Sequence, residues 1–118
     1  MHEEDSMDIV IEEKFTSDEY TIIALSGRLS GANAPEFKNR IREIIKAGKS
    51  RIILDMSGVS FIDSSGLSAL ISGLKYAREA GGFLRLAALQ DQAFKVIKLM
   101  LLDRVFEIYK TIDEAVQS

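Results

Sequence analysis

The stretch RIILDMSGVSFIDSSGLSALISGL, from Arg51 to Leu74, decides the fold. Its consecutive apolar residues, Ile52 to Leu54, predict a strand that is buried on both faces and ends at Asp55. A short loop over residues 56–62 is expected next, and the turn Asp63-Ser64-Ser65-Gly66 then leads into a helix. Because α/β proteins place working groups between a buried strand and a helix N-terminus, Ser64 becomes the main candidate functional residue.

The helix expected after this turn has an unusual composition. Its apolar residues recur every three or four positions until Gly81-Gly82 ends the pattern, and they are Leu67, Leu70, Ile71, Leu74 and Ala77. A second stripe has minimal side chains, Gly66, Ala69 and Gly73, with Ser68 and Ser72 beside it. Since glycine inside a helix costs roughly 0.5–1 kcal/mol relative to alanine, something is expected to approach this face closely. The alternatives are tight packing inside the protein and a docking surface for a partner.

Two strands and a helix are predicted upstream of this stretch. Residues 8–13 alternate between apolar and polar, as edge strands do, and residues 20–25 are more apolar. The polar turn between them indicates an antiparallel hairpin. A loop over residues 26–31 then leads to a helix whose N-cap is Asn33, with Glu36 completing a capping box, and Gly48 ends that helix.

The C-terminal part continues the alternation of strands and helices. A strand over residues 83–87, a helix capped by Asp91 and extending to Leu101, a strand over residues 105–109 and a short helix opened by a Thr111–Glu114 capping box are predicted. The order is ββαβαβαβα. We therefore predict one α/β domain over residues 7–118, with a mixed, mostly parallel sheet of four or five strands and about four helices. Residues 1–6 are expected to form a flexible lead-in.

Composition narrows the classes of partner. The chain has 118 residues, is 47% hydrophobic and has a net charge of −3, which suits a globular domain and disfavours binding to nucleic acid. Six basic residues cluster around one helix and the next strand, but Glu36 and Glu43 interrupt them, so we interpret them as a solvated face; they are Lys38, Arg40, Arg42, Lys46, Lys49 and Arg51. No apolar run approaches the ~20 residues that span a bilayer, so membrane insertion is not expected.

The residue inventory also argues against an enzyme. The only histidine is His2 and cysteine is absent, so a catalytic triad lacks its base and a zinc site lacks its ligands. The glycine-rich loops that bind nucleotide phosphates are missing as well. We predict no catalytic residue, no metal and no cofactor, and the absence of cysteine makes a cytoplasmic location the expectation.

Ser64 has two interpretations. Either Ser64 or Asp63 could simply cap the helix by accepting a hydrogen bond from one of its free N–H groups. Alternatively, Ser64 could be phosphorylated, which adds about −1.5 to −2 charges at neutral pH. The helix N-terminus would accept this charge, whereas a partner docked on small, neutral side chains would meet repulsion. The second interpretation predicts a switch that ends docking without unfolding the domain.

The segments Leu54–Ser57 and Phe61–Leu67 resemble the signature of bacterial anti-sigma factor antagonists, which are STAS-domain proteins. Leu25–Leu29 and Leu101–Phe106 extend the resemblance over nearly the whole chain. It implies a mixed sheet with helices packed on one side, and Ser64 as the phosphoacceptor. It further implies that the unphosphorylated form binds an anti-sigma factor that is also a serine kinase, which frees a sigma factor. A metal-dependent serine phosphatase would restore that form.

The resemblance also implies a docking surface around Ser64. Its predicted members are Arg28, Ser30, Asp63, Ser65, Gly66 and Ser68. Family members often carry Gly-Glu-(Leu/Ile)-Asp before the first helix, whereas this chain has Arg28 and Ser30 at the two acidic positions. This departure is either a tolerated surface change or the mark of a partner whose own acid faces Arg28.

Other functions and assemblies remain open at this point. The chain could be a STAS subunit without a switch, in a signalling scaffold or an ABC-type lipid-transport complex. A nucleotide-binding enzyme is a third class, and the missing phosphate loops count against it. The first strand, or the apolar run from Leu99 to Leu102, could serve a homodimer, but both could equally be core or edge.

Overall fold

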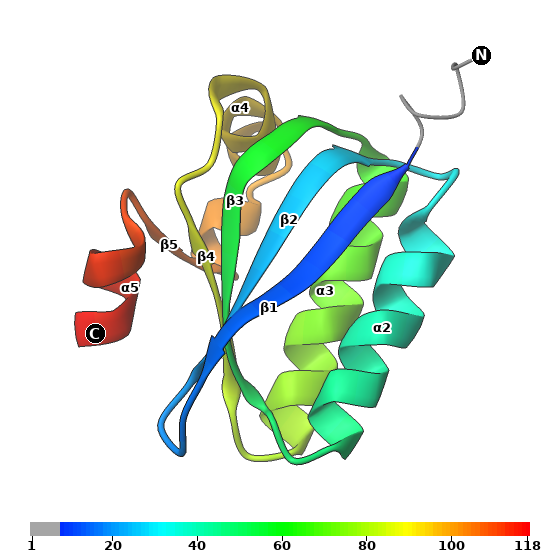
Figure 1. Cartoon of the computed structure of the whole chain (residues 1–118). Coiled ribbons are helices and arrows are strands. Elements are labelled where there is room, and N and C mark those ends of the chain that lie inside the picture. Colours follow the sequence, from blue (N-terminus) through cyan, green and yellow to red (C-terminus); the bar gives the residue numbers. More distant parts are fainter. Residues whose placement is uncertain (1–7) are drawn as a thin grey trace.

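The computed structural model describes residues 8–118 (Figure 1). The lead-in expected at residues 1–6 lies outside them. The strands are β1 (Ile9–Thr16), β2 (Thr21–Leu29), β3 (Arg51–Ile62), β4 (Phe83–Ala87) and β5 (Glu107–Tyr109). The helices are α2 (Ala34–Lys46), α3 (Ser64–Glu79), α4 (Asp91–Leu99) and α5 (Ile112–Gln117), and a 3₁₀ turn spans Leu102–Arg104. The predicted order ββαβαβαβα is confirmed.

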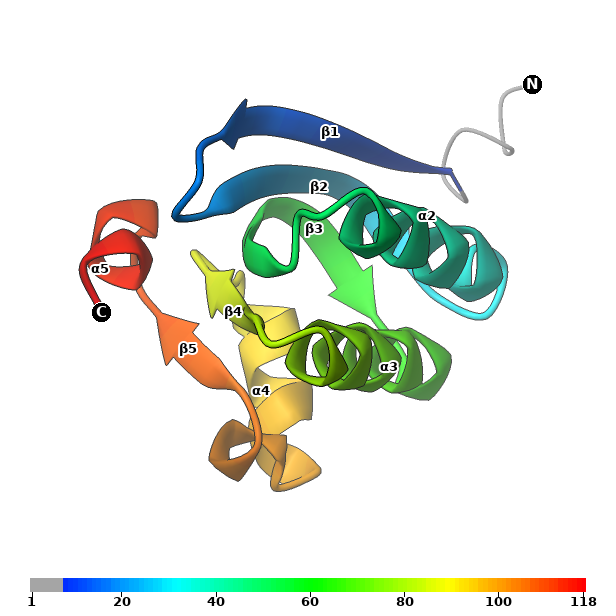
Figure 2. The same cartoon turned by 90° about the horizontal axis from the view of Figure 1, so that it is seen from below.

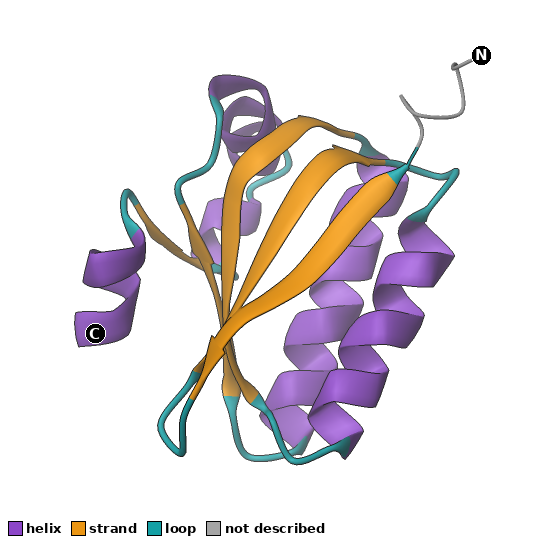
Figure 3. Ribbon diagram, in the orientation of Figure 1, coloured by secondary structure: helices purple, strands orange, loops and turns teal. Residues whose placement is uncertain are grey.

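The five strands form one sheet in the order β1-β2-β3-β4-β5 (Figure 3). β1 and β2 pair antiparallel, which confirms the predicted hairpin, and the other three neighbouring pairs are parallel. The prediction of a mixed, mostly parallel sheet is therefore confirmed. β1 lies at one edge of the sheet, where its Val10 is half exposed.

Helices cover both faces of the sheet, although unequally (Figure 2). The main core joins β1–β4 to α2, α3 and α4, and its fully buried side chains include Ile23, Leu54, Phe37, Leu70 and Ile97. A smaller cluster on the opposite face joins Ile53 and Ala87 to Ala115 of α5. The expectation that the helices pack on one side thus holds for α2, α3 and α4, while α5 packs on the other face.

β2 and β3 are longer than the sequence suggested. The predicted loops over residues 26–31 and 56–62 are wrong for most of their length, because the two strands stay paired as far as Leu29 and Ile62. Register shifts after Ala24 and Gly27 break the alternation along the strands. Val59 and Ile62 are nevertheless buried in the main core. The apolar pattern therefore looks irregular although the strand is continuous.

The C-terminal elements are shorter than predicted. α4 begins with Asp91 as its first helical residue and has Gln90, not Asp91, at the N-cap position. It ends at Leu99, so Leu101 lies outside the helix with a positive φ of 60° and is exposed. β5 begins at Glu107 and not at residue 105. Half of the capping box predicted for α5 is confirmed, since Thr111 Oγ1 accepts a hydrogen bond from the N–H of Glu114 at 3.1 Å. The Glu114 carboxylate accepts from the Lys110 N–H, one residue before the N-cap, at 3.2 Å.

Asn33 stands at the N-cap position of α2, but its side chain does not cap the helix. Its Oδ1 accepts a hydrogen bond from the Ser30 N–H at 3.1 Å, and its Nδ2 donates to the Arg28 carbonyl at 2.7 Å. The predicted capping box with Glu36 is therefore wrong. The buried Asn33 side chain instead holds the loop between β2 and α2 in shape.

The stripe of small residues on α3 faces inward. Gly66, Ala69 and Gly73 are all buried. A methyl group on Gly66 would overlap the carbonyl oxygen of Leu29, and one on Gly73 would lie 3.2 Å from Leu84 Cδ1. Of the two alternatives for this stripe, tight packing inside the protein is the one that the structure shows.

Replacing Gly66 with alanine should destabilise the domain. Alanine favours helices by roughly 0.5–1 kcal/mol over glycine, but here its methyl group would push the Leu29 backbone away. We expect a net loss of about 1–3 kcal/mol in the free energy of unfolding, measured by urea denaturation. Ser65→Ala, at an exposed neighbouring position, is the control and should change stability by less than about 0.5 kcal/mol. A neutral or stabilised Gly66→Ala variant would contradict the packing described.

Asn33→Ala should also lower stability. The change leaves the Ser30 N–H and the Arg28 carbonyl without the partner that Asn33 supplies, at an expected cost of about 1–3 kcal/mol. The matched control is Asn39→Ala at an exposed position of the same helix. Equal unfolding free energies for the two variants would show that the Asn33 side chain does not hold the loop.

Candidate functional site

The turn that carries Ser64 lies at the end of the sheet where β2 and β3 finish (Figure 1). β3 ends at Ile62, Asp63 occupies the N-cap position, and Ser64 is the first residue of α3. The Asp63 N–H donates to the carbonyl of Leu29, the last residue of β2, at 3.3 Å. The sheet therefore sets where α3 starts, and it leaves Ser64 and Ser65 exposed.

Asp63, and not Ser64, caps the helix. Asp63 Oδ1 accepts a hydrogen bond from the Gly66 N–H at 2.9 Å, and Oδ2 accepts one from the Gly31 N–H at 3.3 Å. Among the hydrogen bonds of residues 8–118, none involves the Ser64 hydroxyl. Of the two residues considered as the cap, Asp63 is therefore the one that caps the helix. The hydroxyl of Ser64 faces solvent and does not cap it.

The loop before α2 lies against this turn. Gly31 is bound by Asp63, and a methyl group placed on Gly31 would lie 3.5 Å from Ser65 Oγ. Ser30, its half-buried neighbour, is held by Asn33. Ser30 and the Asp63–Ser65 turn, which are far apart in the sequence, are therefore brought together as the docking surface would require.

The remaining predicted docking residues differ in exposure. Arg28 is exposed on β2, and its guanidinium stacks on the Phe61 ring at 4.1 Å from the centroid. Ser68 is exposed one turn along α3 from Ser64. Gly66 is buried against Leu29, so it allows the turn to pack closely and has no exposed surface for a partner to contact.

Sequence reasoning missed one residue that supports the turn. Gln92 of α4 forms two hydrogen bonds with the backbone of Ile62, accepting from its N–H at 2.9 Å and donating to its carbonyl at 3.0 Å. This amide fixes the last residue of β3 directly before the turn. No local sequence pattern predicts these hydrogen bonds, because Gln92 and Ile62 are 30 positions apart.

Two residues of the basic cluster, interpreted from the sequence as a solvated face, also line a surface hollow. Lys38 is half-buried and Arg42 is exposed, and with Ser65 and Ser68 of α3 they line this hollow of about 530 Å³. This hollow begins beside the Ser64 turn, and its walls are the two helices. The basic cluster of the sequence therefore contributes to a defined groove.

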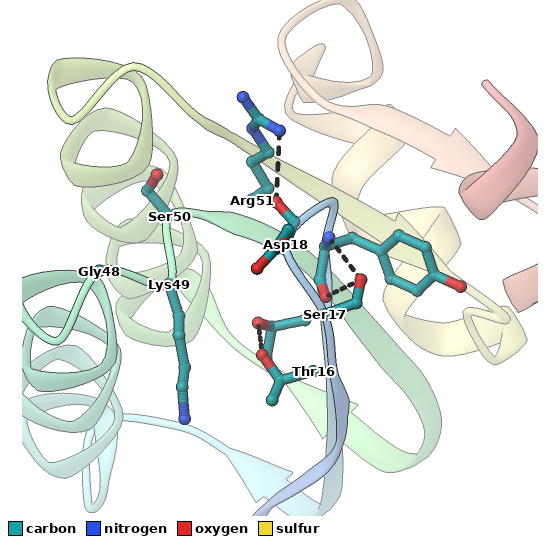
Figure 4. Close-up of a pocket in the computed structure, with 9 residues that line it drawn as sticks. Thr16, Ser17, Asp18, Gly48, Lys49, Ser50 and Arg51 are labelled. Carbon is teal, nitrogen blue, oxygen red and sulfur yellow. Dashed lines mark hydrogen bonds between the residues drawn. The ribbon is translucent and has the colours of Figure 1, made fainter.

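A second hollow, of about 550 Å³, lies at the opposite end of the sheet (Figure 4). Its two cations, Lys49 and Arg51, point in different directions in this view. Lys49 Nζ pairs with Glu13 Oε1 at 2.7 Å, and Arg51 donates to the Asp18 carbonyl at 3.5 Å. Because these groups do not converge on one point, the Ser64 turn remains the better candidate site.

No group of three or more histidine, cysteine, aspartate or glutamate residues within residues 8–118 could hold a metal ion. None of the helices there is both long enough and apolar enough to cross a membrane.

Known proteins are similar to this chain in sequence and in fold. The family model of the STAS domain matches residues 11–115. A Thermotoga maritima protein described as "Putative anti-sigma factor antagonist" is 34% identical over 101 residues, which cover 85% of this chain and 89% of that protein. The anti-sigma-B factor antagonist of Listeria monocytogenes is 27% identical over 103 residues, covering 86% and 90% of the two chains.

The structural comparison agrees. The crystal structure of a protein given the same description, also from Thermotoga maritima, superimposes with a TM-score of 0.80 at 31% sequence identity. The match covers 91% of this chain and 92% of the other. Sequence and fold thus point to one family over nearly the whole described length, and the chain belongs to the STAS domain family, among its anti-sigma factor antagonists.

Proposed function

We propose that this protein is a phosphorylation-controlled anti-sigma factor antagonist that works in the cytoplasm. Its unphosphorylated form binds an anti-sigma factor that is also a serine kinase, and a sigma factor is thereby released. Phosphorylation of Ser64 by that kinase ends the binding, and a metal-dependent serine phosphatase restores it. In this proposal the protein is a substrate of two enzymes and performs no catalysis itself.

One observation carries the proposal. Ser64 is exposed at the first position of α3, while the neighbouring Asp63 supplies the cap that the helix needs. A kinase can therefore modify the Ser64 hydroxyl without removing a hydrogen bond on which the fold depends. Ser65 follows it in the chain, and Gly31, the neighbour of Ser30, contacts the same turn, so small neutral groups are available there for docking.

The effect of a phosphate follows from its charge. It would add about −1.5 to −2 charges at neutral pH, and the partial positive charge of the α3 N-terminus would help to accommodate it within the folded protein. A partner that docks on the exposed serines would instead have to bury a doubly charged group beside the Asp63 carboxylate. The switch would thus act on docking and leave the fold intact.

The proposal is tested by affinity purification from the native host, followed by mass spectrometry. Wild type, Ser64→Ala and Ser64→Asp serve as baits. We expect wild type and Ser64→Ala to retrieve a serine kinase of the anti-sigma type. Ser64→Asp should retrieve at least tenfold less, equivalent to about 1.4 kcal/mol in binding. Phosphate on the wild-type protein should map to Ser64.

The control bait is Gln117→Glu, which adds the same charge at an exposed position of α5 and should behave as wild type. If all baits retrieve the same proteins, none of them a kinase, and Ser64 carries no phosphate, the switch does not exist. The chain would then be a constitutive STAS subunit of a scaffold or a transport complex.

A further inference from the structure

The groove between α2 and α3 continues the surface that carries Ser64. Its first part is the hollow lined by Lys38, Arg42, Ser65 and Ser68. Beyond Arg42 a shallower hollow of about 310 Å³ follows, bounded by Lys46, Tyr76 and Glu79 among others. We call these two hollows together the α2/α3 groove. It therefore runs from the phosphorylation candidate down both helices.

The acidic side chains of α2 line a different hollow from Lys38 and Arg42. The charged side chains that line the first hollow are Lys38 and Arg42, and the α3 wall facing them contributes hydroxyl groups. Glu36 and Glu43 line a different hollow, toward β1, together with Arg40. A chain with a net charge of −3 thus directs cations into the α2/α3 groove and keeps the acids of the same helix outside it. Glu79 is the acid at the groove's far end.

Two arginines on this side of the molecule are held by aromatic rings. Arg42 stacks on the Tyr76 ring at 4.6 Å from the centroid and donates to the Tyr76 hydroxyl. Arg28, on the sheet side of the turn, is stacked on Phe61. The acid next to Ser64 in the chain is Asp63, and both of its carboxylate oxygens already accept backbone N–H groups. Arg42 is therefore oriented within the α2/α3 groove, and the carboxylate beside Ser64 is engaged internally.

We infer that the α2/α3 groove docks an acidic segment of the partner protein, an inference that rests on the proposed function and specifies its partner. Complementary charge is the first reason, because Lys38 and Arg42 meet no acid of this chain in the first hollow. The second reason is the direction of the switch, because phosphorylation is proposed to end binding. A phosphate on Ser64 at the mouth of the groove repels an acidic segment, whereas it attracts a basic one and would strengthen docking. Of these two charges on the partner, the acidic one is the one that phosphorylation would release.

The first test uses defined probes and does not need the natural partner. Isotope-labelled full-length protein is titrated at low salt with poly-L-glutamate, poly-L-lysine or a short DNA duplex, and backbone amide shifts are followed by NMR. Poly-L-glutamate should shift the amides of Lys38, Arg42, Ser65 and Ser68, and Ser64→Asp should weaken that binding several-fold. Shifts confined to other surfaces would overturn the inference. If the duplex binds more tightly and shifts the same amides, the groove would be a site for nucleic acid and not for an acidic protein segment.

The second test uses the kinase capture described above with charge-reversal variants. The bait Lys38→Glu/Arg42→Glu should capture at least tenfold less kinase than wild type. The matched control Lys95→Glu/Lys98→Glu makes the same change in net charge on α4, where both lysines are exposed, and should retain it. Because Arg42 contacts Tyr76, the melting temperatures of the variants are compared. The Lys38 side chain forms no hydrogen bond within residues 8–118, and Lys38→Glu alone should reduce the captured kinase in part.

The outcomes separate this inference from the proposed function. If wild type captures a kinase and the groove variants capture it equally well, the acidic-segment inference is wrong while the switch stands. If no kinase is captured, the proposed function fails, and the poly-L-glutamate titration alone decides whether the groove binds acidic chains. Loss of the kinase with the control variant as well would assign the effect to overall charge and overturn the role of the groove.

Discussion

The carboxylate of Asp63 is the constraint on which the site depends. Its two oxygens accept hydrogen bonds from the N–H groups of Gly66 and Gly31, which are more than 30 residues apart in the sequence. One side chain therefore starts α3 and at the same time fixes the loop that leads into α2. Because this aspartate satisfies the helix terminus, the serine after it is free to take part in chemistry with another protein.

The groups that support this turn come from the sheet, from the loop before α2 and from α4. The sheet contributes Leu29, whose carbonyl accepts from the Asp63 N–H and lies against Gly66. The loop contributes Asn33, and α4 contributes Gln92. These hydrogen bonds tie the turn to its neighbours in the free protein, so the proposed docking would cost little conformational entropy. The exposed serines are thus presented by a scaffold that is already organised.

The sequence predicted the architecture well because the signals for it are local. Apolar runs, glycine stops and hydroxyl caps gave the order of elements and the sheet class, and the DSSG turn pointed to Ser64. What it could not predict depends on contacts between distant residues. The extensions of β2 and β3 arise from bulged pairing between them, and Asn33 looked like a helix cap although it binds the preceding loop. Likewise, the hollow that Lys38 and Arg42 line could not be predicted, because α3, which forms its other wall, is distant in the sequence.

The strand order has a consequence for how the chain folds during its synthesis. Each strand of the sheet lies beside the strand that precedes it in the sequence, so every new strand that leaves the ribosome finds its neighbour already made. No early strand waits with an open edge for a partner encoded much later, and loop closure spans only one connection at a time. The two strands that support the Ser64 turn, β2 and β3, can pair while β4, β5 and α5 are still being translated.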